Sequence, residues 1–227
     1  LRPAGLQEVE PGALALRLEA QADLGREQRE AVTEVAISMP PVVLRWLLSP
    51  HLSAFYAQHP RIRLLLQSSA QLSNLHERQA DIALRLLRPE ANDLVVRRLR
   101  PLRFGFYADA GYLHRNARAD WRFLTLSTQN PLSHWAQDII DNQPITLACN
   151  DFEVIKQSTA AGLGIGFLPQ DSIQPQDGLL PIAVRGEIPE IHEETLYLVM
   201  HEDVRRSQKV RAVADFLVEV LTDSSNA

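Results

Sequence analysis

The chain has 227 residues, a formal net charge of −5 and 45% hydrophobic residues, which suits one large domain or two small ones with their own cores. The acidic balance argues against a chain that grips nucleic acid by itself, because such domains are usually basic. Cys149 is the single cysteine, so no internal disulfide can form, and this is typical of a reducing compartment such as the cytoplasm.

The first 30 residues predict one amphipathic helix. Val9, Ala13, Leu16, Ala20 and Leu24 recur at helical spacing and form a single stripe. Because the stripe is narrow and rich in alanine, it suits pairing with another helix better than covering a large core. A surface helix of the same domain is the alternative.

After Arg29 the pattern alternates between strands and helices. The first strand is predicted at 34–38, and the helix after it begins at Pro40 and Pro41 and is kinked or restarted at Pro50 before it ends near residue 58. Further strands are predicted at 62–67, 80–86, 94–99, 104–107, 123–126, 145–149, 164–168, 179–184 and 195–201, with helices at 72–77 and 204–221. This alternation favours an α/β fold with a mostly parallel sheet, divided into two lobes on either side of Tyr107.

The segment from Asn150 to Pro169 predicts a short helix, a glycine-rich turn and an apolar strand. A dinucleotide-binding fingerprint has the opposite order, because its glycines follow a strand and open a helix. The glycines therefore predict a helix C-cap followed by a buried strand. Asn150 with Glu153 three residues later fits a capping box, which predicts a helix N-terminus that faces a ligand cleft.

Two separated motifs resemble the regulatory domain of LysR-type transcriptional regulators. The first comprises Pro50, Leu52, Phe55, His59, Pro60, Ser68, Ser69, Leu72, Leu75 and the string Asp81-Ile82-Ala83-Leu84-Arg85. The second comprises Val154 and the string from Ala161 to Pro169. In addition, Leu1-Arg2-Pro3-Ala4-Gly5 is similar to the end of the family's winged helix-turn-helix module.

The resemblance implies an α/β fold of two Rossmann-like subdomains, like a type 2 periplasmic-binding protein, with a cleft between them and an amphipathic linker helix before them. The expected parts are a dimerisation helix at 1–30, subdomain I at 31–107 plus 202–227, and subdomain II at 108–201. It also implies the ligand-sensing portion of a regulator that forms a homodimer or homotetramer and binds DNA only through a domain upstream of Leu1. The subunits would pair through the helix at 43–58 and the strand at 62–67.

Two-lobed sheets of this kind bind ligands at the carboxyl ends of their strands. The predicted effector contacts are Ser38, Met39, Gln67, Ser68, Ser69, Arg85, Leu86, Thr128, Asn130, Asn150, Asp151 and Phe167. The effector is expected to be a polar or anionic small molecule, and Arg85 can pair with its carboxylate, although Asp81 and Glu90 are alternative partners. Structural alternatives also exist, namely a helix cap for Ser38, a turn for the serine pair, and core positions for Met39 and Phe167.

The sequence offers no support for an enzyme. The histidines lack metal-ligand spacing, and no G-x-S-x-G elbow surrounds a serine, so no catalytic residue, metal or cofactor is predicted. The sequence also predicts neither a signal peptide nor a membrane span. The main alternative function is a solute-binding protein of a transport system, which shares the two-lobed plan. The N-terminal helix and the match at residues 1–5 argue against it.

Overall fold

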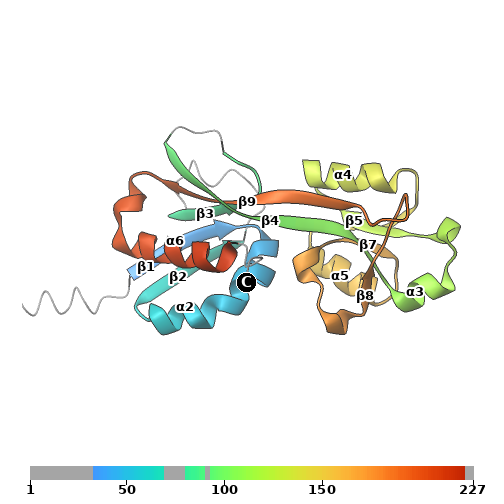
Figure 1. The fold of residues 1–227 in the computed structure, drawn as a ribbon, viewed down its shortest axis with the longest axis horizontal. Coiled ribbons are helices and arrows are strands. Elements are labelled where there is room, and N and C mark those ends of the chain that lie inside the picture. The colour runs from blue at the N-terminus through green and yellow to red at the C-terminus, as the bar shows by residue number, and fades with distance from the viewer. Residues whose placement is uncertain (1–32, 69–79, 90–92, 223–227) are drawn as a thin grey trace, which may run out of the picture.

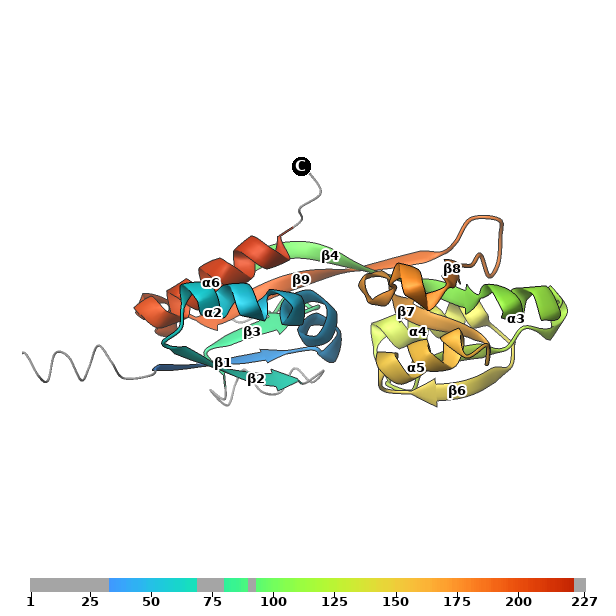
Figure 2. The same cartoon turned by 90° about the horizontal axis from the view of Figure 1, so that it is seen from below.

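The computed structural model describes residues 33–68, 80–89 and 93–222. They form two lobes joined by two long antiparallel strands, β4 (Leu94–Asp109) and β9 (Ile191–His201), as Figures 1 and 2 show. The helices predicted at 1–30 and 72–77 lie outside the described residues.

The first lobe is built on three short strands. β1 (Thr33–Met39) lies between β2 (Ile62–Ser68) and β3 (Ile82–Arg85) and is parallel to both. Two helices, α2 (Leu52–Gln58) and α6 (Gln208–Leu221), lie on one side of these strands (Figure 2). The rings of Phe55 and Phe216 meet at 5.0 Å between the two helices. The predicted last helix is thus confirmed, except that its first residues form a 3-10 turn, η7 (Val204–Arg206).

The second lobe repeats the parallel arrangement. β5 (Phe123–Leu126) lies between β6 (Ile145–Cys149) and β7 (Ile165–Pro169) and is parallel to both. The chain crosses from β5 to β6 through α4 (Pro131–Ile140) and returns from β6 to β7 through α5 (Phe152–Ala160). Because right-handed crossovers in opposite directions use opposite faces of a sheet, α4 and α5 cover different faces (Figure 1). A further helix, α3 (Ala110–Arg115), follows β4, and β8 (Leu179–Pro181) pairs with that strand.

The sheet is mixed, so the prediction of a mostly parallel sheet was wrong. The strand order is β2-β1-β3-β9-β4-β7-β5-β6, and β4 and β9 run antiparallel to each other and to their other neighbours β7 and β3. The strands predicted at 94–99 and 104–107 form one continuous strand whose register shifts between Arg98 and Pro101. Proline has no N–H to donate, so the hydrogen-bond pairing of β4 with β9 is interrupted there and continues in a shifted register. The sequence-based lobe boundaries stay a prediction, because β4 and β9 run through both lobes.

The helix after β1 is interrupted, as Pro50 predicted. It consists of a π-helix, η1 (Val43–Leu48), a 3-10 turn, η2 (Ser49–His51), and α2. Pro50 cannot donate to the carbonyl of Trp46, the acceptor of a regular α-helix, and the Ser49 N–H donates to the Leu44 carbonyl five residues back. The proline therefore accounts for the wide turn before it.

The glycine-rich segment is the predicted helix C-cap and buried strand. Gly162 has a φ of 75°, and the Leu163 N–H donates to the Ser158 carbonyl at 3.1 Å. A Cβ on Gly166 would overlap the buried hydroxyl of Thr159, so this glycine lets α5 pack directly on β7.

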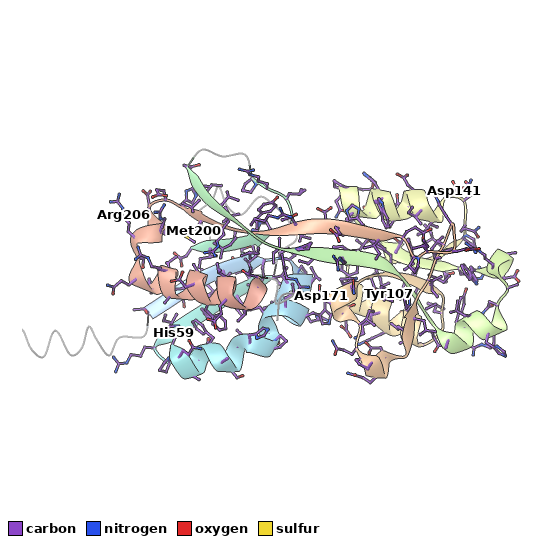
Figure 3. All side chains as sticks on the ribbon, viewed as in Figure 1. His59, Tyr107, Asp141, Asp171, Met200 and Arg206 are labelled. Atoms are coloured by element: carbon purple, nitrogen blue, oxygen red, sulfur yellow. The ribbon has the colours of Figure 1, made fainter. Side chains whose placement is uncertain are left out.

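Side chains fill the interior of both lobes (Figure 3). In the second lobe the core is aromatic, with the Phe106 ring 5.3 Å from Phe167, 6.0 Å from Phe123 and 6.2 Å from Trp135. These rings join β4, β5, β7 and α4 in one core.

Candidate functional site

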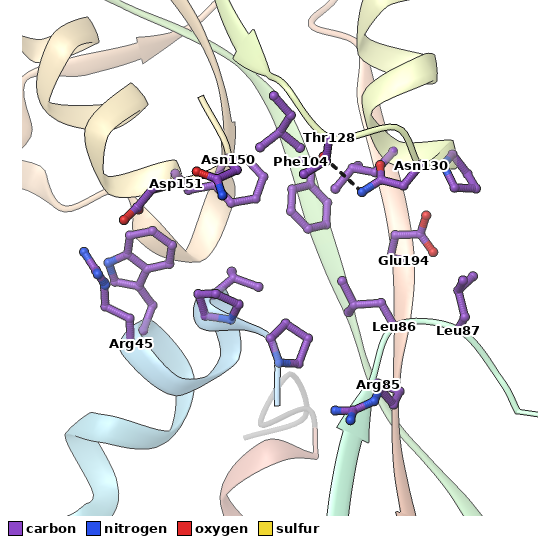
Figure 4. Close-up of a pocket in the computed structure, with 18 residues that line it drawn as sticks. Arg45, Arg85, Leu86, Leu87, Phe104, Thr128, Asn130, Asn150, Asp151 and Glu194 are labelled. Atoms are coloured by element: carbon purple, nitrogen blue, oxygen red, sulfur yellow. Dashed lines mark hydrogen bonds between the residues drawn. The ribbon is translucent and has the colours of Figure 1, made fainter. Parts of the chain in front are cut away.

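A cavity of about 220 Å³ lies between the lobes (Figure 4). Its walls come from the segments that follow β1, β3, β5 and β6, at the carboxyl ends of these strands, and from side chains of β4 and β9. The rule that ligands of such sheets bind at strand ends therefore holds for the geometry of this cavity.

Most of the cavity wall is apolar. Prolines and large hydrophobic side chains form it, namely Pro40, Pro41, Val42, Trp46, Leu86, Leu87, Phe104, Leu126, Pro131, Leu132 and Phe152. The rings of Phe104 and Phe152 lie 5.8 Å apart. An apolar cavity of about 150 Å³ is large enough for benzene, so this one has room for a ring or short chain with a polar substituent.

Arg85 places a buried positive charge at the cavity. The residue is only 3% exposed. Its Nη1 donates to the carbonyls of Ser38 (3.0 Å) and Leu84 (2.8 Å), its Nη2 donates to the Ser38 hydroxyl (2.9 Å), and its Nε has no partner. Burial lowers the pKa of this guanidinium, but an arginine remains charged at neutral pH.

No carboxylate among the described residues pairs with Arg85. Asp81, one of the predicted alternative partners, accepts instead from the Ala36 N–H at 2.8 Å, and Glu90 lies outside the described residues. A buried cation without a counter-charge favours an anion in the neighbouring cavity.

Two helix N-termini meet the opposite wall. Asn130 caps α4, because its Oδ1 accepts from the Ser133 N–H at 2.8 Å, and its Nδ2 donates to the Thr128 hydroxyl at 3.2 Å. Asp151 caps α5 by accepting from the Glu153 N–H at 2.8 Å. The prediction that Asn150 caps this helix was therefore wrong. The positive end of the α4 dipole, which a neutral side chain caps, adds to the attraction for an anion, whereas the Asp151 carboxylate already compensates the positive end of α5.

Three further charged groups belong to the cavity or border it. Arg45 lines it and pairs with Glu153 of α5, with 3.2 Å between Nη1 and Oε2. Glu194 lines it from β9, and its Oε1 lies 2.8 Å from Nε2 of His192. The cavity thus holds both signs of charge around its apolar walls.

The predicted contact residues divide into three groups. Those that line the cavity are Arg85, Leu86, Thr128, Asn130, Asn150 and Asp151. Ser38 lies behind Arg85 as its acceptor, while Met39 and Phe167 are fully buried in the core and Gln67 and Ser68 lie at the end of the edge strand β2. Ser69 lies outside the described residues. The binding roles of all these residues stay predictions.

The sequence reasoning missed several cavity residues. Val42, Arg45 and Trp46 had a signal, since they follow a strand end and share a helical spacing of three and four. Phe104 and Glu194 had no such signal in the sequence. They lie within the long strands β4 and β9, which reach the cavity only through their antiparallel pairing.

Comparison with known proteins identifies the family. Residues 28–222 match the family model described as LysR substrate binding domain, and the chain belongs to this family. The chain is 28% identical over 206 residues to the HTH-type transcriptional regulator CrgA of Neisseria meningitidis serogroup C, covering 85% of this chain and 68% of CrgA. It is 31% identical over 108 residues to an HTH-type transcriptional repressor of Pseudomonas aeruginosa, covering 48% of this chain and 32% of that protein.

Solved structures agree with this assignment. The CrgA regulatory domain superposes with a TM-score of 0.71 at 25% identity, covering 83% of this chain and 98% of that domain. Full-length AphB from Vibrio cholerae shares the fold with a TM-score of 0.65 at 17% identity, over 92% of this chain and 76% of AphB. The chain is therefore an effector-binding domain of a LysR-type transcriptional regulator with the two-lobed, periplasmic-binding-protein-like fold. The predicted family and the predicted fold are both confirmed, and the function of a regulator is favoured over that of a solute-binding transport protein.

None of the helices among residues 33–68, 80–89 and 93–222 has the length and apolar character to cross a lipid bilayer. Within the same ranges, no cluster of three or more metal-binding side chains occurs.

Proposed function

We propose that this chain senses a small anionic molecule, held between the lobes with its negative group at Arg85. The observation that carries the proposal is the buried guanidinium at the cavity, which has an unused Nε donor and no carboxylate partner among the described residues. The N-terminus of α4 on the opposite wall, which the neutral Asn130 caps, supports the same sign of charge.

The cavity chemistry suggests how a ligand would be held. The apolar walls would take a ring or short chain, Arg85 its carboxylate, and Thr128, Asn130 and Asn150 any hydroxyl or amide group. A ligand that touches both lobes stabilises the lobe arrangement it fits best, and only that difference in affinity shifts the population. The register shift of β4 between Arg98 and Pro101 is a suitable pivot for such a change.

The signal would pass to DNA through a partner subunit. We infer a homodimer or homotetramer that works in the cytoplasm and re-spaces two DNA-reading domains, with no catalysis by this domain. The edge strand β2 and the neighbouring helix α2 are suited to subunit pairing, since Leu65 and Tyr56 are 39% and 42% exposed.

A thermal-shift screen tests the proposed ligand class. The panel holds benzoate, cyclohexanecarboxylate and hexanoate, each beside its neutral amide. A carboxylate that binds should raise the melting temperature by mass action. At a ligand concentration of one hundred times Kd, binding stabilises the folded state by about 2.7 kcal/mol, and the neutral amides should cause no such shift. Thr128→Ala should weaken the best ligand by about tenfold, the effect of one lost hydrogen bond.

Ser127→Ala is the matched control, because the neighbouring Ser127 side chain is exposed and does not line the cavity. It should leave the shift unchanged. A panel in which amides stabilise the protein as well as their acids would refute the anionic class.

A further inference from the structure

An ion pair joins the lobes at the edge of the cavity. Arg45 belongs to the π-helix η1 of the first lobe, and Glu153 to the first turn of α5 in the second. Their side chains meet at 3.2 Å and are 46% and 25% exposed. Figure 4 shows the Arg45 head group at the margin of the cavity, beside Asp151.

Arg45 contributes both to the cavity wall and to an ion pair between the lobes. Its side chain lines the cavity, and its guanidinium is held by a carboxylate of the opposite lobe. Pro50 sets this position, because the wide turn that it causes contains Arg45. A guanidinium has five N–H donors in a fixed fork, so it can bind a carboxylate of a ligand in place of that of Glu153.

The exchange has a low cost on the protein side. Partly exposed ion pairs contribute little to stability, so the pair is easily broken. Glu153 also keeps two other favourable interactions, since its Oε1 accepts from Gln157 Nε2 at 3.1 Å and it lies in the first turn of α5. The carboxylate therefore remains compensated when Arg45 leaves.

We propose that Arg45 is an exchangeable latch, which pairs with Glu153 across the lobes and exchanges this partner for a second negative group of a ligand whose first negative group lies at Arg85. The inference rests on the proposed function, because it requires an anion in this cavity. It goes further by making ligand binding and the lobe-to-lobe contact mutually exclusive. Binding then loosens one contact between the lobes, and through linkage a stronger contact weakens binding.

Calorimetric titration with terephthalate, which carries two carboxylates, tests the exchange through a double-mutant cycle of Arg45→Gln and Glu153→Gln. Glu153→Gln removes the competitor, so terephthalate should bind about two- to fivefold more tightly, whereas the affinity for benzoate, whose one carboxylate lies at Arg85, should not change. Arg45→Gln removes a partner of the ligand and should weaken binding by about fivefold. In the Arg45→Gln background, the added Glu153→Gln should change the affinity by less than about 1.5-fold, because no latch is left to release.

Glu34→Gln is the charge-matched control. Glu34 pairs with Arg63 at 3.3 Å in an exposed pair between β1 and β2, away from the cavity. It should leave the affinity for terephthalate unchanged.

The possible contrary results separate the two ideas. Unchanged or weaker binding by Glu153→Gln overturns the latch while the binding site stands. Equal tightening in both backgrounds also overturns it, because simple charge repulsion by Glu153 would then explain the gain. If no carboxylate of the panel binds the wild-type protein, the proposed function fails and the latch with it.

Discussion

Arg85 uses one guanidinium for two purposes. Its Nη atoms hold Ser38 at the end of β1, while its Nε is buried without a hydrogen-bond partner, in a residue that lines the cavity. The sequence predicted both residues as separate ligand contacts because each follows a strand. It could not reveal that Ser38 serves Arg85, since the two are 47 positions apart and meet only because β1 and β3 pair.

Gly166 shows a residue whose importance is steric. It allows α5 to approach β7 so closely that a Cβ would overlap the Thr159 hydroxyl. Gly166→Ala should therefore lower the free energy of unfolding by about 1–3 kcal/mol, as overpacking of a filled core does. Urea denaturation followed by circular dichroism measures the change.

Gly186→Ala is the control for that substitution, since the nearest atom to its added Cβ is 4.0 Å away. Its unfolding free energy should stay within about 0.5 kcal/mol of the wild type. Equal losses in the two variants would show that the contact with Thr159 is unimportant.

At the scale of elements, local signals predicted most strands and missed two helices. The strands at 123–126 and 145–149 were predicted with their observed bounds, because they are short apolar runs with clear ends. α4 was missed although Asn130 and Pro131 form a recognisable start, with a capping asparagine before a proline at the first helical position. α3 was also missed, although the Asp109 side chain accepts from the Tyr112 N–H as an N-cap does.

The π-helix η1 gives a prediction at the same scale. Pro50→Ala restores a donor for the Trp46 carbonyl, so the wide turn should tighten towards an α-helix and rotate Arg45 and Trp46 within the cavity. We expect a stronger helical signal in circular dichroism and about three- to tenfold weaker benzoate binding, the effect of one misplaced contact.

Pro175→Ala provides the comparison for Pro50, because Pro175 lies in the first turn of the exposed 3-10 helix η6 (Pro175–Asp177), where a missing donor costs nothing. Pro175→Ala should change neither the circular dichroism spectrum nor the affinity for benzoate. An unaltered affinity in Pro50→Ala would separate the wide turn from ligand binding.

At the scale of the molecule, two series of alternating strands and helices were enough to predict two lobes and a cavity at the strand ends. They were not enough to predict how the lobes connect. β4 and β9 cross from one lobe to the other and pair through long-range contacts that leave no periodic trace in the sequence. For that reason the strand ends at Arg85, Thr128 and Asn150 were predicted, whereas Phe104 and Glu194 were not.

The central claim is that the charge of Arg85 holds the negative group of a ligand between the lobes. Isothermal titration of benzoate and benzamide into the wild-type protein and Arg85→Met tests it most directly, with circular dichroism to establish that the variant is folded. We expect the wild type to prefer benzoate and Arg85→Met to bind it at least about tenfold more weakly, as the loss of a charge-assisted hydrogen bond requires. Equal affinity of the two proteins for benzoate would contradict the account.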